Sequence, residues 1–321
     1  MKAVQLVGNK KFIFIDTDII EPKVNQCLLK VNYVSVCGTD TRREFDKDLP
    51  PESYPMSPGM PCHEVVGTIY KSNSLLFNEG DRVLAVPTGD DGLQEYLTLH
   101  ESRFIKLPAE GSLDDWVMCQ HSGTALYASK QWGNPLGKTI TIIGQGGIGI
   151  SFTMIANMQG ASKIIGVDIN QSRLDIARSL GATNTINISQ NNLPESVLDI
   201  NDGVFSDIVV EATGRPEGLN NCISIVKQGG IVICFGLTSE EYVPFNQNVF
   251  LSKNCKIIST LIAGTETPLK EIKEMIDLKN RGLINPGLLK THNMHWSKVQ
   301  EAYDLYNATS EGMIKIALEV S

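Results

Sequence analysis

The stretch "TITIIGQGGIGISFTMIANMQGASKIIGVD", residues 139–168, decides the fold class of this chain of 321 residues. An apolar strand leads into a glycine-rich turn, a helix is expected from Gly147 to about Gln159, and a second strand ends in Asp168. The turn fits G-x-G-x-x-G, and an acidic residue about twenty positions further on completes a dinucleotide-binding βαβ unit. The stretch therefore predicts an α/β fold with a Rossmann-type, doubly wound parallel sheet.

The residues of this turn have separate roles in binding a dinucleotide. Gly144 permits the tight turn, Gly146 lets a pyrophosphate approach the backbone, and Gly149 lets the helix pack against the strand. The helix start offers free N–H groups and a positive dipole end to the phosphates. The candidate cofactor residues of the turn are Gly144, Gly146, Gly147, Ile148 and Gly149.

The acidic residue at the end of the second strand indicates which cofactor is bound. The carboxylate of Asp168 can accept hydrogen bonds from both hydroxyls of the adenosine ribose, and its charge would repel a 2′-phosphate. NAD is therefore favoured over NADP. Arg173 lies five residues further on; it either covers the adenine or ribose or relieves that repulsion. An FAD site usually has this motif at the N-terminus, whereas here the motif lies in the middle of the chain.

The remainder of the chain contains two regions that differ in predicted secondary structure. Residues 1 to about 120 are short strands separated by Gly/Pro turns, and strands alternate with helices from about Asp114 onward. The tail from about Pro286 ends in a helix and a strand that can fold back onto the first part. We expect a β-rich unit over 1–121, a nucleotide-binding unit over 122–265, and a return to the first unit over 266–321.

The composition excludes several classes of protein. The formal net charge of −8 at pH 7 disfavours binding to nucleic acid or to an anionic membrane. No run approaches the roughly 18 apolar residues of a membrane span, and the N-terminal stretch lacks the apolar segment of a signal peptide. The seven cysteines are irregularly spaced and form no C-x-x-C pair, which argues against a disulfide scaffold. We expect a soluble, cytoplasmic protein.

A second pattern indicates a metal. In "SPGMPCHEVVG", residues 57–67, His63 and Glu64 lie side by side before an apolar strand. Cys37 follows an earlier strand, and Cys119 lies at a helix start. Two cysteines and a histidine with an open fourth position form a known catalytic zinc arrangement. From the residues alone, an incidental His-Glu pair and cysteines in the core remain open alternatives.

The ordered motifs resemble those of one protein family. "CGTD", "HE" before "VVG", "GDRV", "GQGGIG", "VVEATG" and "GGIVICFGL" are similar to the motifs of the zinc-type medium-chain dehydrogenases/reductases, the alcohol dehydrogenase-like superfamily. The resemblance covers essentially the whole chain. It implies a GroES-like catalytic domain for the β-rich unit, beside the Rossmann domain.

The resemblance also implies roles for individual residues. Cys37, His63 and Cys119 correspond to the ligands of one catalytic zinc. Asp40 corresponds to the acid that orients the histidine, and Thr39 to the hydroxyl that hydrogen-bonds the substrate oxygen and starts a proton relay. Glu64 corresponds to a glutamate that ligates the metal transiently. Cofactor-facing strand ends correspond to Thr213 and to Phe235 and Leu237, for which ordinary packing is an alternative.

The chain departs from the family pattern at several positions. The stretch directly after "GDRV", "LAVPTGDDGLQEYL", contains none of the four closely spaced cysteines of family members with a structural zinc, so we expect no structural zinc. Thr124 lies five residues after Cys119 instead of four, which leaves open whether His121 contributes to the site. Arg42 and Arg43 stand where a relay histidine is often found; they either hold an anionic group of the substrate or form a solvated basic pair.

The function implied is an NAD- and zinc-dependent oxidoreductase that acts on an alcohol or polyol, or on the matching aldehyde or ketone. One alternative is a zinc-independent quinone or enone reductase of the same superfamily, and another is a non-catalytic nucleotide-binding member. Related proteins commonly pair through the strand that corresponds to "CKIISTLIA", residues 255–263, so a homodimer or homotetramer is expected.

Overall fold

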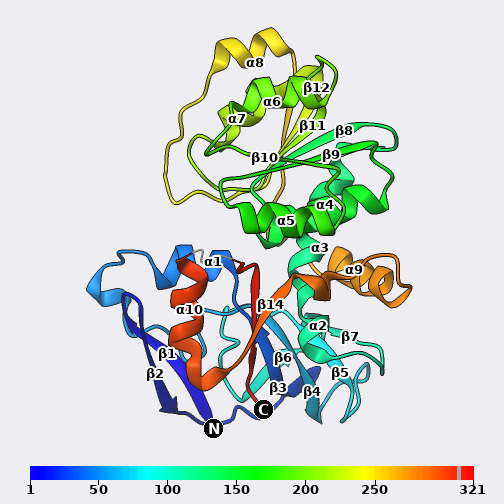
Figure 1. The fold of residues 1–321 in the computed structure, drawn as a ribbon. Coiled ribbons are helices and arrows are strands. Elements are labelled where there is room, and N and C mark those ends of the chain that lie inside the picture. Colours follow the sequence, from blue (N-terminus) through cyan, green and yellow to red (C-terminus); the bar gives the residue numbers. More distant parts are fainter. Residues whose placement is uncertain (309–311) are drawn as a thin grey trace. The chain divides into compact units, whose positions relative to one another are not determined.

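The computed structural model describes residues 1–308 and 312–321, and the chain divides into two compact units. Unit 1 combines Met1–His121 with Ile272–Ser321, and unit 2 is Ser122–Glu271. The C-terminal segment therefore belongs to unit 1. Figure 1 traces the chain through both units.

Unit 2 is built on one parallel sheet of six strands in the order β10-β9-β8-β11-β12-β13. This is the doubly wound order of a Rossmann fold, which confirms the predicted fold class. The strands are β8 (Thr139–Ile143), β9 (Lys163–Asp168), β10 (Asn184–Asn187), β11 (Ser206–Glu211), β12 (Val226–Cys234) and β13 (Lys256–Ser259).

Helices cover both faces of this sheet, with α4 and α5 on one face and α6 and α7 on the other (Figure 1). The helices are α3 (Met118–Ser129), which begins in unit 1, α4 (Gly147–Met158), α5 (Gln171–Ser179), α6 (Leu193–Ile200), α7 (Gly218–Ile225) and α8 (Gln247–Lys253), with 3-10 turns at Lys130–Trp132 and Ile262–Gly264.

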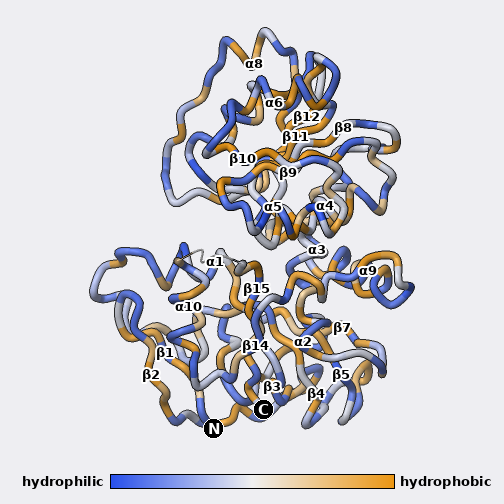
Figure 2. Tube along the Cα trace, in the orientation of Figure 1, coloured by the Kyte–Doolittle hydropathy of each residue, from blue (hydrophilic) through white to orange (hydrophobic). Residues whose placement is uncertain are grey.

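The apolar sequence of the central strands explains their position. All five residues of β8 are buried, as expected for a strand covered on both faces. Figure 2 shows the hydrophobic residues gathered along the strands. Polar side chains set the helix starts: the side chain of Asn170 accepts hydrogen bonds from the first backbone N–H groups of α5, and Asn192 does the same for α6.

Unit 1 contains a seven-stranded sheet and a two-stranded hairpin. The sheet has the order β14-β15-β3-β4-β5-β7, with β6 also paired to β3, and the hairpin is β1-β2. The strands are β1 (Lys2–Gly8), β2 (Lys11–Asp16), β3 (Gln26–Ser35), β4 (Glu64–Ser72), β5 (Arg82–Ala85), β6 (Tyr96–His100), β7 (Phe104–Lys106), β14 (Lys290–His295) and β15 (Lys315–Glu319).

The helical segments of unit 1 are short apart from two. They are α1 (Gly38–Asp40), the π-helix Thr41–Phe45, α2 (Leu113–Trp116), α9 (Lys270–Asn280), which begins in unit 2, α10 (Val299–Asn307), and 3-10 turns at Pro51–Ser53, Glu101–Arg103, Pro286–Leu289 and Trp296–Lys298. In the described ranges, no helix is long and apolar enough to cross a membrane.

The C-terminal strand completes the sheet of unit 1. β15 pairs antiparallel with β3, so Ala317 lies opposite Ser35. The last strand of the chain therefore lies in the same sheet as the N-terminal strand β3. The strand β14, "KTHNMH", was not predicted, because its exposed and half-buried positions are filled mainly by polar residues.

Candidate functional site

Three neighbouring strands of unit 1 each have one terminus at the same edge of the sheet. β3 runs toward Cys37, β4 starts at Glu64, and β15 starts at Lys315. The register aligns them: Ser35 lies opposite Glu64 in one neighbouring strand and opposite Ala317 in the other. Side chains on these strand ends are therefore held by the backbone ladder of a buried sheet.

A group of metal-binding atoms lies at these strand ends. Ligand atoms of Cys37, His63 and Glu64 lie within 4.8 Å of one another. Zinc bonds of about 2.0 to 2.3 Å place the ligand atoms of one ion at most about 4.6 Å apart, close to that spacing. A thiol, an imidazole and a carboxylate are suitable zinc donors, so the residues present fit this metal.

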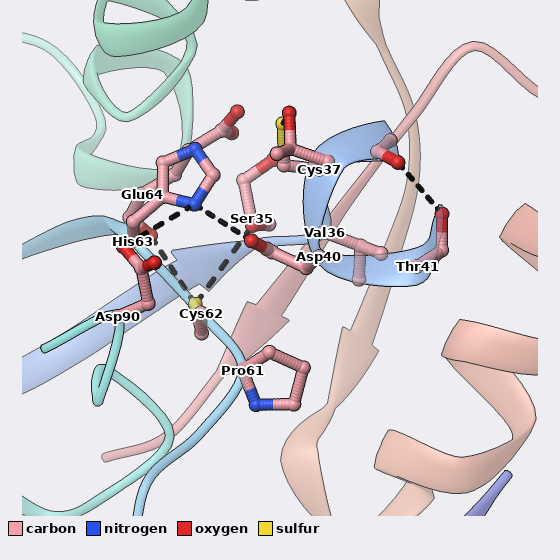
Figure 3. Close-up of polar contacts among 12 residues, drawn as sticks. Ser35, Val36, Cys37, Asp40, Thr41, Pro61, Cys62, His63, Glu64 and Asp90 are labelled. Carbon is pink, nitrogen blue, oxygen red and sulfur yellow. Dashed lines mark hydrogen bonds and ion pairs between the residues drawn. The ribbon is translucent and has the colours of Figure 1, made fainter. Parts of the chain in front are cut away.

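Asp40 orients the histidine of this group. Its Oδ1 lies 2.6 Å from Nδ1 of His63, and a second carboxylate oxygen, of Asp90, lies 3.9 Å from the same nitrogen (Figure 3). Because Asp40 engages Nδ1, the Nε2 atom is left for a metal. Burial lowers the pKa of His63, but Asp40 and Cys37 outweigh burial and raise this pKa well above its usual value.

Glu64 lies in a buried ion pair. Its Oε2 accepts a hydrogen bond of 2.7 Å from the ammonium of Lys315, and neither side chain is exposed. The other oxygen, Oε1, is buried and has no hydrogen-bond partner among the residues that the structure describes. A buried carboxylate oxygen without a partner is costly, and a metal ion would satisfy it.

Cys119 lies outside this group, although the sequence placed it among the ligands. It is fully buried near the start of α3, and burial raises the pKa of its thiol to about 12. Residues two apart on a helix point to opposite faces. His121 is buried as well: burial lowers its pKa well below the usual value, and the charges of Lys315 and His63 lower it further.

The segment after Cys37 carries the expected hydroxyl and an unexpected carboxylate. The thiol of Cys37 donates to Oγ1 of Thr39 at 3.7 Å, so this hydroxyl lies beside a candidate ligand. Glu44 lies in the following π-helix, and burial and the charge of Asp40 raise its pKa to about 7. Arg42 and Arg43, in the same turn, are exposed.

In unit 2 the glycine-rich turn follows β8, as predicted. Gly144 has φ of 93°, a left-handed conformation that favours glycine. A Cβ on Gly149 would lie 1.7 Å from the carbonyl oxygen of Gly144, whereas a Cβ on Gly146 would meet only Nη1 of Arg173, at 3.9 Å. The backbone therefore leaves free space at Gly146 and none at Gly149.

Asp168 and Arg173 lie at this turn. The carboxylate of Asp168 accepts hydrogen bonds from the backbone N–H groups of Gln145, at 2.6 Å, and of Asn170, at 2.9 Å. A carboxylate has about four acceptor positions, so Asp168 keeps capacity for ribose hydroxyls while it ties the turn to β9. This second role was not predicted from the sequence.

The other candidate cofactor residues follow the ends of β11 and β12. Thr213 donates its hydroxyl to Oε1 of Glu211 at 2.5 Å, and its methyl carbon lies close to Gly144. The ring of Phe235 packs edge-on against Phe152 of α4, with centroids 5.3 Å apart. Leu237 is 48% exposed. Thr213 is thus at the turn, whereas Phe235 has a packing role in addition to any contact with a cofactor.

Besides Glu44, two charged residues of unit 1 were missed. Lys315 is the single charged residue among the buried positions of β15, and a lysine within the apolar run "MIKIAL" was the available signal. Asp90 lies in the loop between β5 and β6, and nothing in "PTGDDG" indicates its approach to His63.

Known proteins resemble the chain along its whole length. Residues 23–125 match the family described as alcohol dehydrogenase GroES-like domain, and residues 147–280 match zinc-binding dehydrogenase. An alcohol dehydrogenase of Cupriavidus necator is 25% identical over 369 aligned residues, which cover 99% of this chain and 98% of that protein.

Solved structures support the same fold. The alcohol dehydrogenase from Thermus sp. ATN1 has a TM-score of 0.88 at 22% identity and covers 100% of both chains. A short chain alcohol dehydrogenase from E. coli CFT073, complexed with NADH, has a TM-score of 0.87 at 21% identity and covers 100% of this chain and 99% of that chain. These likenesses confirm the fold class, in which one chain contains a GroES-like unit and a Rossmann unit.

Proposed function

Because the chain belongs to the zinc-type medium-chain dehydrogenases/reductases, we propose that it transfers a hydride between an alcohol or polyol and NAD. The observation that carries the proposal is the group of Cys37, His63 and Glu64 at the end of β3 and the start of β4, in a chain that also has an open dinucleotide turn. A metal-independent reductase has no need of such a donor set.

We assign the metal to Cys37 and His63, with Glu64 as the third donor. The buried Oε1 of Glu64, which has no hydrogen-bond partner, supports this assignment. The position of Cys119 outside the group argues against the ligand set that the sequence suggested. When bound, zinc would supply a Lewis acid that lowers the pKa of a substrate hydroxyl.

Thr39 is the residue whose hydroxyl would accept a hydrogen bond from that substrate hydroxyl and, as the proton moves to it, pass its own proton on to water or a ribose hydroxyl of the cofactor. Its Oγ1 lies 3.7 Å from the Sγ atom of Cys37, so the hydroxyl lies within reach of a substrate oxygen at the metal. Asp40 would keep His63 in the tautomer that presents Nε2, through the 2.6 Å contact with Nδ1. Both roles depend on contacts within unit 1.

NAD is the proposed cofactor, and Asp168 provides a test of that preference. Asp168→Asn keeps one of the two side-chain acceptors, for the N–H of Gln145 or of Asn170, and removes the charge that repels a 2′-phosphate. We expect kcat/KM with NAD to fall about tenfold and the preference for NAD over NADP to narrow by about 100-fold, or about 2.8 kcal/mol. Steady-state kinetics with both cofactors measure this. An unchanged NAD/NADP ratio would remove Asp168 from cofactor selection.

One zinc per chain, and no structural zinc, is part of the proposal. The segment between β5 and β6, residues 86–95, contains no cysteine, so it cannot supply the thiolates of a structural site. Metal analysis of protein purified without added metal or chelator, with an alcohol and polyol panel assayed with NAD, tests the proposal. One zinc and turnover are expected. Turnover that survives complete zinc removal would favour the zinc-independent reductase, and tight NAD binding without turnover on any alcohol would favour a binding protein.

A homodimer or homotetramer and a cytoplasmic location complete the proposal. β13 ends the strand order of unit 2, and an edge strand presents backbone groups that a second copy can pair with. All seven cysteines, each in a described range, are free thiols, as in a reducing compartment. A monomer mass in light scattering of the purified chain would contradict the oligomer.

A further inference from the structure

Lys315 has an environment unusual for a lysine. Its side chain is 0% exposed, and its ammonium donates to Oε2 of Glu64 and to the carbonyl oxygen of Val36, both at 2.7 Å. Val36 directly precedes the candidate ligand Cys37. Removing an ammonium group from water costs free energy unless the group is paired and hydrogen-bonded. These contacts therefore explain how Lys315 can be buried in its charged form.

The backbone brings this lysine to the metal-binding group from the far end of the chain. Glu64 and Lys315 lie 251 positions apart in sequence and start the two strands that flank β3. The N–H of Val36 donates to the carbonyl oxygen of Ile316 at 3.1 Å, which fixes the start of β15 against the end of β3. Figure 3 shows the other side chains at these strand ends.

The side chains around the metal-binding group carry an excess of negative charge that a divalent ion would reduce. In their ionised forms, Cys37, Asp40, Glu64 and Asp90 carry four negative charges, and Lys315 carries one positive charge. A divalent cation would offset two of the remaining three. Lys315 therefore supplies part of the positive charge that a metal also supplies, and it does so on the same carboxylate, since Oε2 is taken and Oε1 is free.

We propose that Lys315 is a positioning residue that competes with the bound metal for the Glu64 carboxylate. The inference rests on the proposed zinc function. Because its ammonium hydrogen-bonds Oε2, Lys315 would weaken the bond between the Glu64 carboxylate and a metal ion. A substrate oxygen would then displace this carboxylate more easily. Without the metal, the same ammonium stabilises the buried carboxylate and keeps the strand ends folded.

The test measures metal release in chain loaded with Co²⁺, which replaces zinc and reports its ligands through its visible spectrum. We expect Lys315→Met to slow the transfer of Co²⁺ to a chelator by about tenfold or more, the scale on which contacts to a ligand tune metal affinity. Its spectrum should shift toward a higher coordination number, and kcat should fall. Lys315→Arg keeps the charge and should release Co²⁺ at a rate close to that of the wild type.

Two further variants make the test specific. Glu64→Gln combined with Lys315→Met removes both members of the ion pair. This double variant should no longer show the slow release of Co²⁺ that is expected for Lys315→Met alone. Lys290→Met removes another paired lysine of unit 1, which contacts Asp115 at 2.8 Å, and should leave release unchanged. Release from Lys315→Met at the wild-type rate or faster, or slow release that persists in the double variant, would overturn the inference.

Thermal unfolding provides a second readout if Lys315→Met folds poorly without metal. The inference expects added Co²⁺ to raise the Tm of this variant more than that of the wild type, because the metal replaces the missing cation. An equal rise in both proteins would contradict it. A wild-type chain that binds no Co²⁺ would instead overturn the proposed function, so the two failures are distinguishable.

Discussion

Cys37→Ala is expected to abolish turnover while leaving the affinity for NADH within about twofold of wild type. The thiol belongs to the metal-binding group, and the loss of Lewis-acid stabilisation worth several kcal/mol corresponds to about a thousandfold or more in kcat. The nucleotide turn lies in unit 2 and shares no residue with that group. The value of kcat and a fluorescence titration with NADH measure these two quantities, and metal analysis shows whether the ion is lost.

Cys119→Ala is the matched variant for this experiment. Both substitutions remove one thiol, but Cys119 lies outside the group and inside the core. We expect Cys119→Ala to keep one zinc per chain and most of its activity, with a small loss of thermal stability. If Cys119→Ala loses the metal and Cys37→Ala keeps it, the assigned ligand set is wrong.

The parts of the site that could be predicted from the sequence are those encoded by neighbouring residues. The glycine-rich turn, its flanking strands and Asp168 occupy one continuous stretch, so their spacing alone defines the βαβ unit. Cys37 and Asp40 are similarly close to each other in sequence, and the contact of Asp40 with His63 at 2.6 Å agrees with the role that the family resemblance implied.

The parts that could not be predicted depend on helix phase and on distant pairing. α2 ends at Trp116 and α3 starts at Met118, and Cys119 lies in the first turn of α3. A shift of one residue rotates a helical side chain by about 100°, which sequence spacing does not resolve. Lys315 reaches Glu64 only because β15 pairs with β3, a contact that no local pattern reveals.

Gly146→Ala and Gly149→Ala each add one methyl group to the same turn, but we expect the first to lower NADH affinity and the second to lower thermal stability. A Cβ on Gly146 has no neighbour closer than 3.9 Å, and φ of −74° at this position suits alanine. The methyl group would therefore leave the fold intact, with a Tm within about 2 °C of wild type. It would fill the space that a pyrophosphate needs, so we expect NADH affinity to fall about 100-fold.

Gly149→Ala places its methyl carbon 1.7 Å from the carbonyl oxygen of Gly144. That oxygen belongs to backbone, so the turn or α4 must move. Overpacking of this kind costs about 1–3 kcal/mol, which lowers the Tm by about 3 to 10 °C. Thermal unfolding and NADH titration of both variants separate a blocked binding site from a displaced helix. Equal Tm values for the two variants would show that Gly149 does not set the packing of α4, and the division of roles within the turn would then be wrong.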